Sequence, residues 1–171
     1  MIFRRRFATL AALAFLSACG APPIPNYAAP PGLTPQTGAS ITGSLIVNPN
    51  PILPNTSVYL IDVDNQRSGF GWQAWQTRTL LAPGPHLLTL GLCQCGIFHN
   101  PVVGSLTLPI TAKPGENLIL ASSVPTVGFF QPGRATAWIQ DSTGAKLTPD
   151  TPVELSPTPQ TIFIPMMAPV R

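Results

Sequence analysis

Two cysteines and a histidine stand close together in the sequence and could carry chemistry. Cys93 and Cys95 are separated by one residue, and His99 follows four positions later. Thiolate and imidazole groups are ligands of zinc and copper, so the three residues could form a metal or redox site. The two cysteines could equally form a local disulfide or stay free. Because residues two apart in an extended strand have Cα atoms about 7 Å apart, a disulfide would need a turn, which Gly96 and Pro101 permit.

An aromatic cluster offers a different kind of chemistry. Phe70, Trp72 and Trp75 lie in a short stretch that also contains glycines. Such a loop could stack on a glycan or on a partner protein. The alternative is that these side chains cover the open end of a hydrophobic core.

The remaining chemical motifs argue against an enzyme. His86 and His99 have no acid and serine arranged with them in a triad order, and the chain lacks a nucleophile elbow, a phosphate-binding glycine loop and an H-E-x-x-H motif. Asp62 to Asn65 resembles the start of a calcium loop, but Arg67 and Gln73 stand where the glycine and the closing acid should be. The sequence therefore predicts a protein without catalysis or cofactor, and an Asp/Asn turn after Val63.

The N-terminus carries an export signal. Arg4, Arg5 and Arg6 precede an apolar run from Phe7 to Leu16. This run is too short to span a bilayer core, which needs about 20 residues. A charged segment followed by a short apolar one is typical of a secretory signal peptide.

The residues that follow this signal resemble the lipobox of bacterial lipoproteins: Leu16, Ser17, Ala18 and Cys19. The resemblance implies a signal peptide over residues 1–18 and an acylated Cys19 that holds the protein to membrane lipid. Ordinary cleavage after Ala18, or an uncleaved anchor, are the alternatives. Gly20 stands where an Asp would retain enteric-type lipoproteins at the inner membrane, so the resemblance favours the outer membrane of a bacterial cell envelope, facing the periplasm.

The charge balance changes once this signal is set aside. The chain carries a net charge of +3, and three of its nine basic residues are Arg4, Arg5 and Arg6. After residue 18, six basic and six acidic side chains remain. Nucleic-acid binding would require a clustered basic face, so it is excluded as a predicted function.

The mature chain divides into a tether and a domain. Residues 19–38 are rich in Pro and Ala and contain no charged residue, which is typical of an extended polyproline segment. Residues 39–171 are predicted to form one domain with a Pro-rich C-terminal tail. The 22 prolines of the whole chain exclude a helical bundle, because proline breaks helix interiors.

Short apolar runs between turn residues predict seven to eight strands and an antiparallel β-sandwich. In Ser57–Val63, Val58, Leu60 and Asp62 are expected to face one way and Val63 the other. Pro83-Gly84 and Pro114-Gly115 predict type II turns between strands. The predicted strands are Ser40–Val47, Ser57–Val63, Trp75–Leu81, His86–Leu92, Ser105–Ala112, Asn117–Ser122 and Arg134–Gln140, with a weaker one at Thr161–Ile164.

Three segments carry a further resemblance. The stretch from Thr79 to Leu90, with Pro83-Gly84-Pro85-His86 at its centre, looks like the hairpin of PEGA-type and immunoglobulin-like modules in bacterial envelope proteins. Ala112–Leu120 and Trp138–Gly144 resemble later strands of small proteobacterial lipoproteins. The resemblance implies a surface-presented β-sandwich without catalysis, whose partner is another envelope protein or a glycan.

Overall fold

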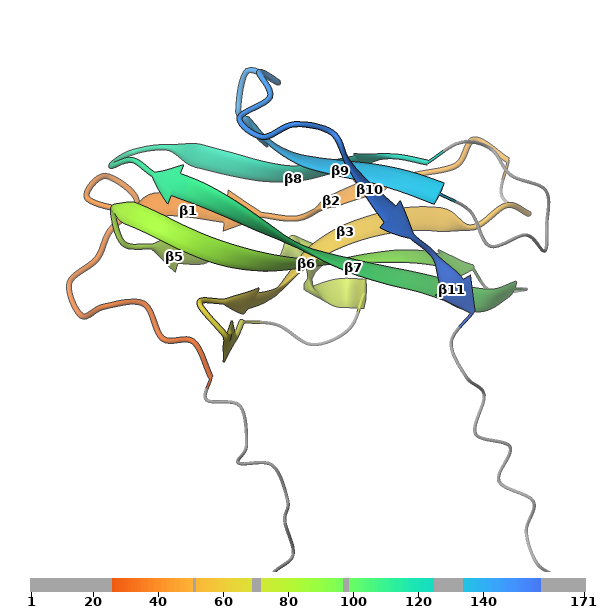
Figure 1. Cartoon of the computed structure of the whole chain (residues 1–171), viewed down its shortest axis with the longest axis horizontal. Helices are drawn as coiled ribbons and strands as arrows, with labels where there is room; N and C mark the ends of the chain where they lie inside the picture. The colour runs from red at the N-terminus through yellow and green to blue at the C-terminus, as the bar shows by residue number, and fades with distance from the viewer. Residues whose placement is uncertain (1–25, 51, 69–71, 97–98, 125–133, 158–171) are drawn as a thin grey trace, which may run out of the picture.

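The chain folds into two β-sheets that pack face to face, as a computed structural model shows (Figure 1). The structure describes residues 26–50, 52–68, 72–96, 99–124 and 134–157. Sheet I contains, in spatial order, β10 (Thr151–Glu154), β9 (Arg134–Asp141), β8 (Asn117–Ser123), β1 (Ala39–Thr42) and β5 (Thr79–Leu81). Sheet II contains β11 (Ser156–Pro157), β7 (His99–Ala112), β6 (Gly84–Gly96), β3 (Asn55–Val63) and β2 (Ser44–Ile46), and β4 (Gln66–Arg67) pairs with β3. The predicted all-β sandwich is confirmed.

The described residues form eleven strands, more than the seven to eight predicted. The predicted strand Ser40–Val47 is in fact β1 and β2, which belong to different sheets. The chain crosses between the sheets at Gly43, where a Cβ atom would collide with the carbonyl oxygen of Val58. Strands as short as β4, β10 and β11 carry no periodic pattern of their own, so only their pairing partners define them. The weaker predicted strand Thr161–Ile164 lies outside the described residues.

The predicted strand Trp75–Leu81 is wrong over its first half. Residues Trp72–Gln76 form a 3₁₀-helix, η1, and only Thr79–Leu81 forms a strand. Trp75 favours a strand at its position, but η1 packs against β3 and makes fewer contacts with β6 and β2. Tertiary packing therefore overrode the local preference.

The pairing is antiparallel except between β1 and β8, which run parallel. Antiparallel neighbours arise where short turns join consecutive strands, as between β3 and β4. β1 instead follows the N-terminal segment, so no tight turn fixes its direction relative to β8. The prediction of a purely antiparallel sandwich misses this one pair.

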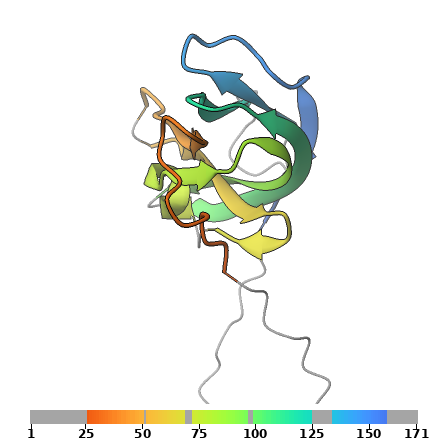
Figure 2. The ribbon, with the colours of Figure 1, turned by 90° about the vertical axis from the view of Figure 1, so that its left-hand side faces the viewer.

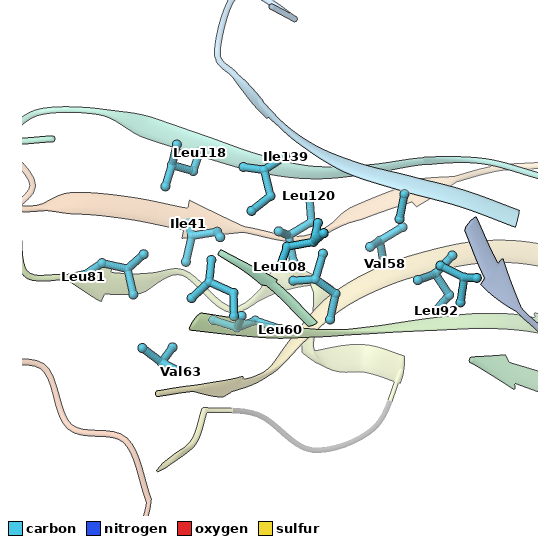
Figure 3. Close-up of a cluster of buried hydrophobic side chains, with 14 of the residues drawn as sticks. Ile41, Val58, Leu60, Val63, Leu81, Leu92, Leu108, Leu118, Leu120 and Ile139 are labelled. Carbon is cyan, nitrogen blue, oxygen red and sulfur yellow. The ribbon is translucent and has the colours of Figure 1, made fainter. Parts of the chain in front are cut away.

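The hydrophobic core lies between the two sheets (Figure 3). Alternate residues of each strand point inward, and each fully buried aliphatic side chain contributes about 1.5–3 kcal/mol. Both sheets supply these side chains, so the sheets stabilise each other. The largest fully buried ones are Ile41, Val58, Val63, Leu81, Leu88, Leu90, Leu92, Leu118, Leu120, Ile139, Val153 and Leu155.

A β-bulge changes which side chains of β3 reach this core. Leu60 of β3 pairs with Leu90 of β6. The next residue of β6 in the ladder, Thr89, pairs with Asp62, so Ile61 is an extra residue in β3. The extra residue reverses the alternation, and Val63 is fully buried together with Leu60. The prediction that Val63 faces the opposite side is therefore wrong.

Two turns show the predicted local chemistry. Asp64 and Asn65 have φ angles of 50° and 62° and join β3 to β4, as in a type I′ hairpin. This arrangement agrees with the predicted Asp/Asn turn. The amide of Glu116 donates to the carbonyl oxygen of Lys113 at 3.2 Å, and Gly115 has a φ of 75°, so Pro114-Gly115 forms the predicted type II turn.

Prolines protect the exposed sheet edges. The Leu87 amide donates to a carboxylate oxygen of Asp64, and the Leu87 carbonyl oxygen accepts from the Asp64 amide. Both backbone groups of Leu87 therefore point away from β7. Its partner Pro109 must therefore direct its nitrogen toward the free edge of β7, where no amide hydrogen is available to pair with another strand. The edge strands β10 and β11 also contain prolines, Pro152 and Pro157. These positions oppose edge-to-edge association.

Candidate functional site

The structure joins Cys93 and Cys95 in a disulfide near the end of β6. Their Cα atoms are 5.5 Å apart, closer than the spacing of about 6.6 Å in an extended strand. The neighbouring Leu92 points into the core, so both cysteines face the outer side of sheet II. Cys93 is only 2% exposed, whereas Cys95 is half-buried. The backbone of His99 pairs with Gly96, and its side chain lies outside the described residues.

The disulfide argues against the predicted alternative of a metal site at Cys93 and Cys95. Both sulfur atoms are bonded to each other, and metal ligation requires free thiolates. Among the side chains that the structure describes, no three His, Cys, Asp or Glu residues are grouped closely enough to hold a metal ion. The arrangement leaves thiol–disulfide exchange as the chemistry available to this pair.

Of the predicted aromatic cluster, the structure describes the side chain of Trp75 but not those of Phe70 and Trp72. Trp75 is half-buried, and its backbone packs against Gly43, where the chain crosses between the sheets. Its helix η1 lies on the side of sheet II away from β8 and β9 (Figure 1). Phe70 lies outside the described residues, and only the backbone of Trp72 is described. A role of this cluster in binding stays a prediction.

An aspartate and a histidine that are 22 residues apart in sequence form a polar site at one end of the sandwich. The Nδ1 atom of His86 lies 2.7 Å from a carboxylate oxygen of Asp64, and its Nε2 atom lies 2.8 Å from the carbonyl oxygen of Ala82. A carbonyl oxygen and an ionised carboxylate can only accept hydrogen bonds. Both ring nitrogens therefore lie against acceptor groups, which hold the ring in place.

The turn before His86 explains this contact. In a type II turn the carbonyl oxygen of Ala82 would accept a hydrogen bond from the residue three positions later. That residue is Pro85, which has no amide hydrogen, and Gly84 has a φ of 131° instead of about 80°. The predicted type II geometry is thus wrong for Pro83-Gly84, and His86 satisfies the carbonyl group instead.

Electrostatics reinforce the pair. Partial burial raises the pKa of the Asp64 carboxyl, but hydrogen bonds from the Leu87 amide and from His86, together with the charge of His86, outweigh burial and hold that pKa below its usual 3.8. The contacts of both ring nitrogens fix the position of His86 at this end of the sandwich.

A shallow groove of about 420 Å³ opens beside this site. His86, Ile110 and Leu147 line it together with Lys113 and Glu116 from the turn between β7 and β8. The strands β10 and β11 cover β7 farther along, but not here. The groove combines apolar walls with the charged side chains of Lys113 and Glu116, and Thr111 adds a hydroxyl group.

The second half of the predicted tether lies on the domain, and we call residues 26–38 the strap. The amide of Tyr27 donates to the carbonyl oxygen of Arg67 on β4 at 2.8 Å, and its hydroxyl donates to that of Leu80 on β5 at 2.7 Å. The ring also packs against the core. Burial, and then the charge of Asp64, raise the pKa of Tyr27, so the phenol keeps the proton that it donates. Tyr27 thereby connects β4 of sheet II to β5 of sheet I. In Figure 2 the strap, in dark orange, runs down the side of the domain that faces the viewer.

The predicted lipobox residues Leu16, Ser17, Ala18 and Cys19 lie outside the described residues. Within the part of the chain that the structure describes, no helix is long and apolar enough to cross a membrane.

Comparisons with protein-family models, with curated proteins and with solved structures give no match. The resemblance to PEGA-type and immunoglobulin-like modules stays a prediction. Arguments about function therefore depend on this chain's own residues.

Proposed function

We propose that the protein is a bacterial envelope lipoprotein, anchored to membrane lipid through an acylated Cys19, with a structural or interaction role and no catalysis. The observation that carries this proposal is the order of three segments at the N-terminus: the arginines at 4–6, the short apolar run, and Leu16-Ser17-Ala18-Cys19. Two or more acyl chains give a stable anchor, because each buried CH₂ contributes about 0.8 kcal/mol.

The histidine at the end of the sandwich fits a structural role, because its ring nitrogens lie within hydrogen-bond distance of Asp64 and of the Ala82 carbonyl oxygen. The balanced charge after residue 18 suits a membrane-held module, since a freely diffusing protein relies more on net charge for solubility. We infer an outer-membrane location facing the periplasm, from Gly20 after the cysteine, and a partner that is an envelope protein or a glycan.

Processing in bacterial cells tests the anchor directly. Globomycin, which inhibits the lipoprotein signal peptidase, should cause a longer precursor to accumulate, and a radiolabelled fatty acid should label the wild-type protein. Cys19→Ala should lose the label and the membrane association. The matched control is Cys93→Ala/Cys95→Ala, which should keep both. Equal release of wild type and Cys19→Ala into the soluble fraction would contradict the anchor.

A second function uses the two cysteines. The alternative is a periplasmic redox or metal-binding protein that uses Cys93, Cys95 and His99, and the disulfide favours its redox form. Intact mass spectrometry separates the possibilities after purification without reductant. A mass two units below the dithiol form, with no metal retained, removes the metal site and leaves only thiol–disulfide exchange. Retained zinc or copper would instead support the metal site.

A further inference from the structure

The strap makes its contacts with the domain at its two ends. At the first end, Tyr27 supplies one amide and one hydroxyl hydrogen bond and packs its ring on the core. At the other, the amide of Gly115 donates to the carbonyl oxygen of Gly38 at 2.8 Å. Between them, the hydrogen bonds of Leu33 and Thr37 stay inside the strap, and nearly all of its residues are exposed.

We propose that the strap is a latch, with Tyr27 as its catch, that sets how far the domain can stand from the membrane. This inference rests on the lipid anchor proposed for Cys19. We call the part of the chain between Cys19 and the first docked residue the leash. With Tyr27 docked, the leash ends at Asn26. With Tyr27 released, it ends at Gly38, which the Gly115 amide still holds next to β1.

Chain length bounds the two reaches whatever the conformation of the leash. A chain spans at most about 3.6 Å per residue, so the seven steps from Cys19 to Asn26 span at most about 25 Å. The nineteen steps from Cys19 to Gly38 span at most about 68 Å by the same limit. Docking of one side chain therefore changes the accessible height of the domain almost threefold.

The docked state also fixes where the leash joins the domain. Asn26 forms a bridge with Arg67 of β4, and the backbone of Tyr27 binds the same residue. The junction therefore lies beside β4, on the opposite side of the view from the segment between β9 and β10 (Figure 1).

The latch is local, because the core does not depend on the strap alone. β6 and β7 pair along twelve positions and bury their own leucines against sheet I. A segment held by few contacts opens more readily than such a ladder. Release of Tyr27 should therefore free the strap while the sandwich stays folded.

Amide hydrogen exchange on the full-length protein in detergent tests the latch itself. In wild type, the Tyr27 amide should be protected. Tyr27→Ala should accelerate its exchange by about 10- to 100-fold, because the hydrogen bond and the ring contact are both lost. Tyr27→Phe keeps the ring and loses only the hydroxyl, so it should lie between the two. In all three proteins β6 and β7 should exchange equally slowly.

Fluorescence energy transfer tests how far the domain stands from the membrane. The acylated protein is placed in vesicles that contain a dansyl-labelled lipid, and transfer from the protein's tryptophans to dansyl is recorded. We expect transfer to fall in Tyr27→Ala relative to wild type, with Tyr27→Phe between them.

The two measurements separate the latch from the anchor. Unprotected exchange at Tyr27 in wild type overturns the latch, and so does equal transfer from wild type and Tyr27→Ala. If Tyr27→Ala also exposes β6 and β7, Tyr27 is part of the core and the latch is wrong. If wild type carries no acyl chain, the lipid anchor fails, and the proposed control of reach fails with it, even where exchange shows that the strap is docked.

Discussion

The sandwich is closed on its two sides by different means. On one side the chain passes from β10 in sheet I to β11 in sheet II, with Val153 and Leu155 buried at the crossing. On the other side Tyr27 connects β4 to β5 through one side chain and two hydrogen bonds. The first closure is built from paired strands and buried aliphatic residues. The Tyr27 contact depends on one aromatic residue, so it can open while the crossing from β1 to β2 at Gly43 keeps the two sheets joined.

The largest loss of stability should come from a change on the side that β10 and β11 close. Leu155→Ala leaves a cavity between the sheets and should lower the free energy of unfolding by about 3 kcal/mol. Thermal denaturation should show a fall in Tm of about 10 °C. The control is Leu147→Ala, because Leu147 is 42% exposed and its truncation should cost less than about 0.5 kcal/mol. Equal losses in the two variants would contradict the importance of this closure.

A change at Tyr27, on the other side, should cost less stability than Leu155→Ala. Tyr27→Ala should lower the free energy of unfolding by about 2 kcal/mol, from lost ring burial and one lost hydrogen bond. Urea denaturation followed by tryptophan fluorescence measures this value. Tyr27→Phe should lose only about 1 kcal/mol. A larger loss of unfolding free energy for Tyr27→Ala than for Leu155→Ala would show that the Tyr27 contact is the stronger closure.

The disulfide lies far from the strap along β6 and gives an independent reference. Cys93→Ala/Cys95→Ala should lower the free energy of unfolding by about 1.5 kcal/mol, since a loop of about three residues loses little chain entropy when it is closed. Exchange of the Tyr27 amide should remain as in wild type. Faster exchange there would show that the two ends of the sandwich are coupled.

The smallest effect should come from the charge pair that supports β4. Asp64→Asn keeps a residue suited to positive φ but removes the charge, and should cost about 0.5–1 kcal/mol at pH 7. The pKa of Asp64 is lower in the folded protein, so its contribution is complete above pH 3.8 and is lost as the pH falls below that value. Urea denaturation at pH 7 and pH 3 should show the difference between wild type and variant shrinking at pH 3. A constant difference would assign the effect to packing.

Local signals predicted much of the fold. Alternating runs such as His86–Leu92 fall inside observed strands, and Pro114-Gly115 forms the predicted turn, because both depend on neighbouring residues. The bulge at Ile61, the helix η1 and the paired strands β10 and β11 escaped prediction. Each depends on contacts between segments far apart in the chain.

The site shows the same division. The sequence drew attention to Cys93 and Cys95, and their spacing left a disulfide open as one alternative. It gave no signal for the pairing of Asp64 with His86, or for the docking of Tyr27 within a segment rich in proline. A tyrosine in such a segment was the only available hint, because an apolar ring in a solvated tether has nothing to bury it.

The sequence by itself determined the fold class and, through residues 1–19, the proposed export and anchor, because strand periodicity, turn residues and a lipobox are all read over a few neighbouring positions. Only the tertiary structure decided where the tether ends. Tyr27 needs Arg67 and Leu80 as partners, and these come together only after the two sheets have packed.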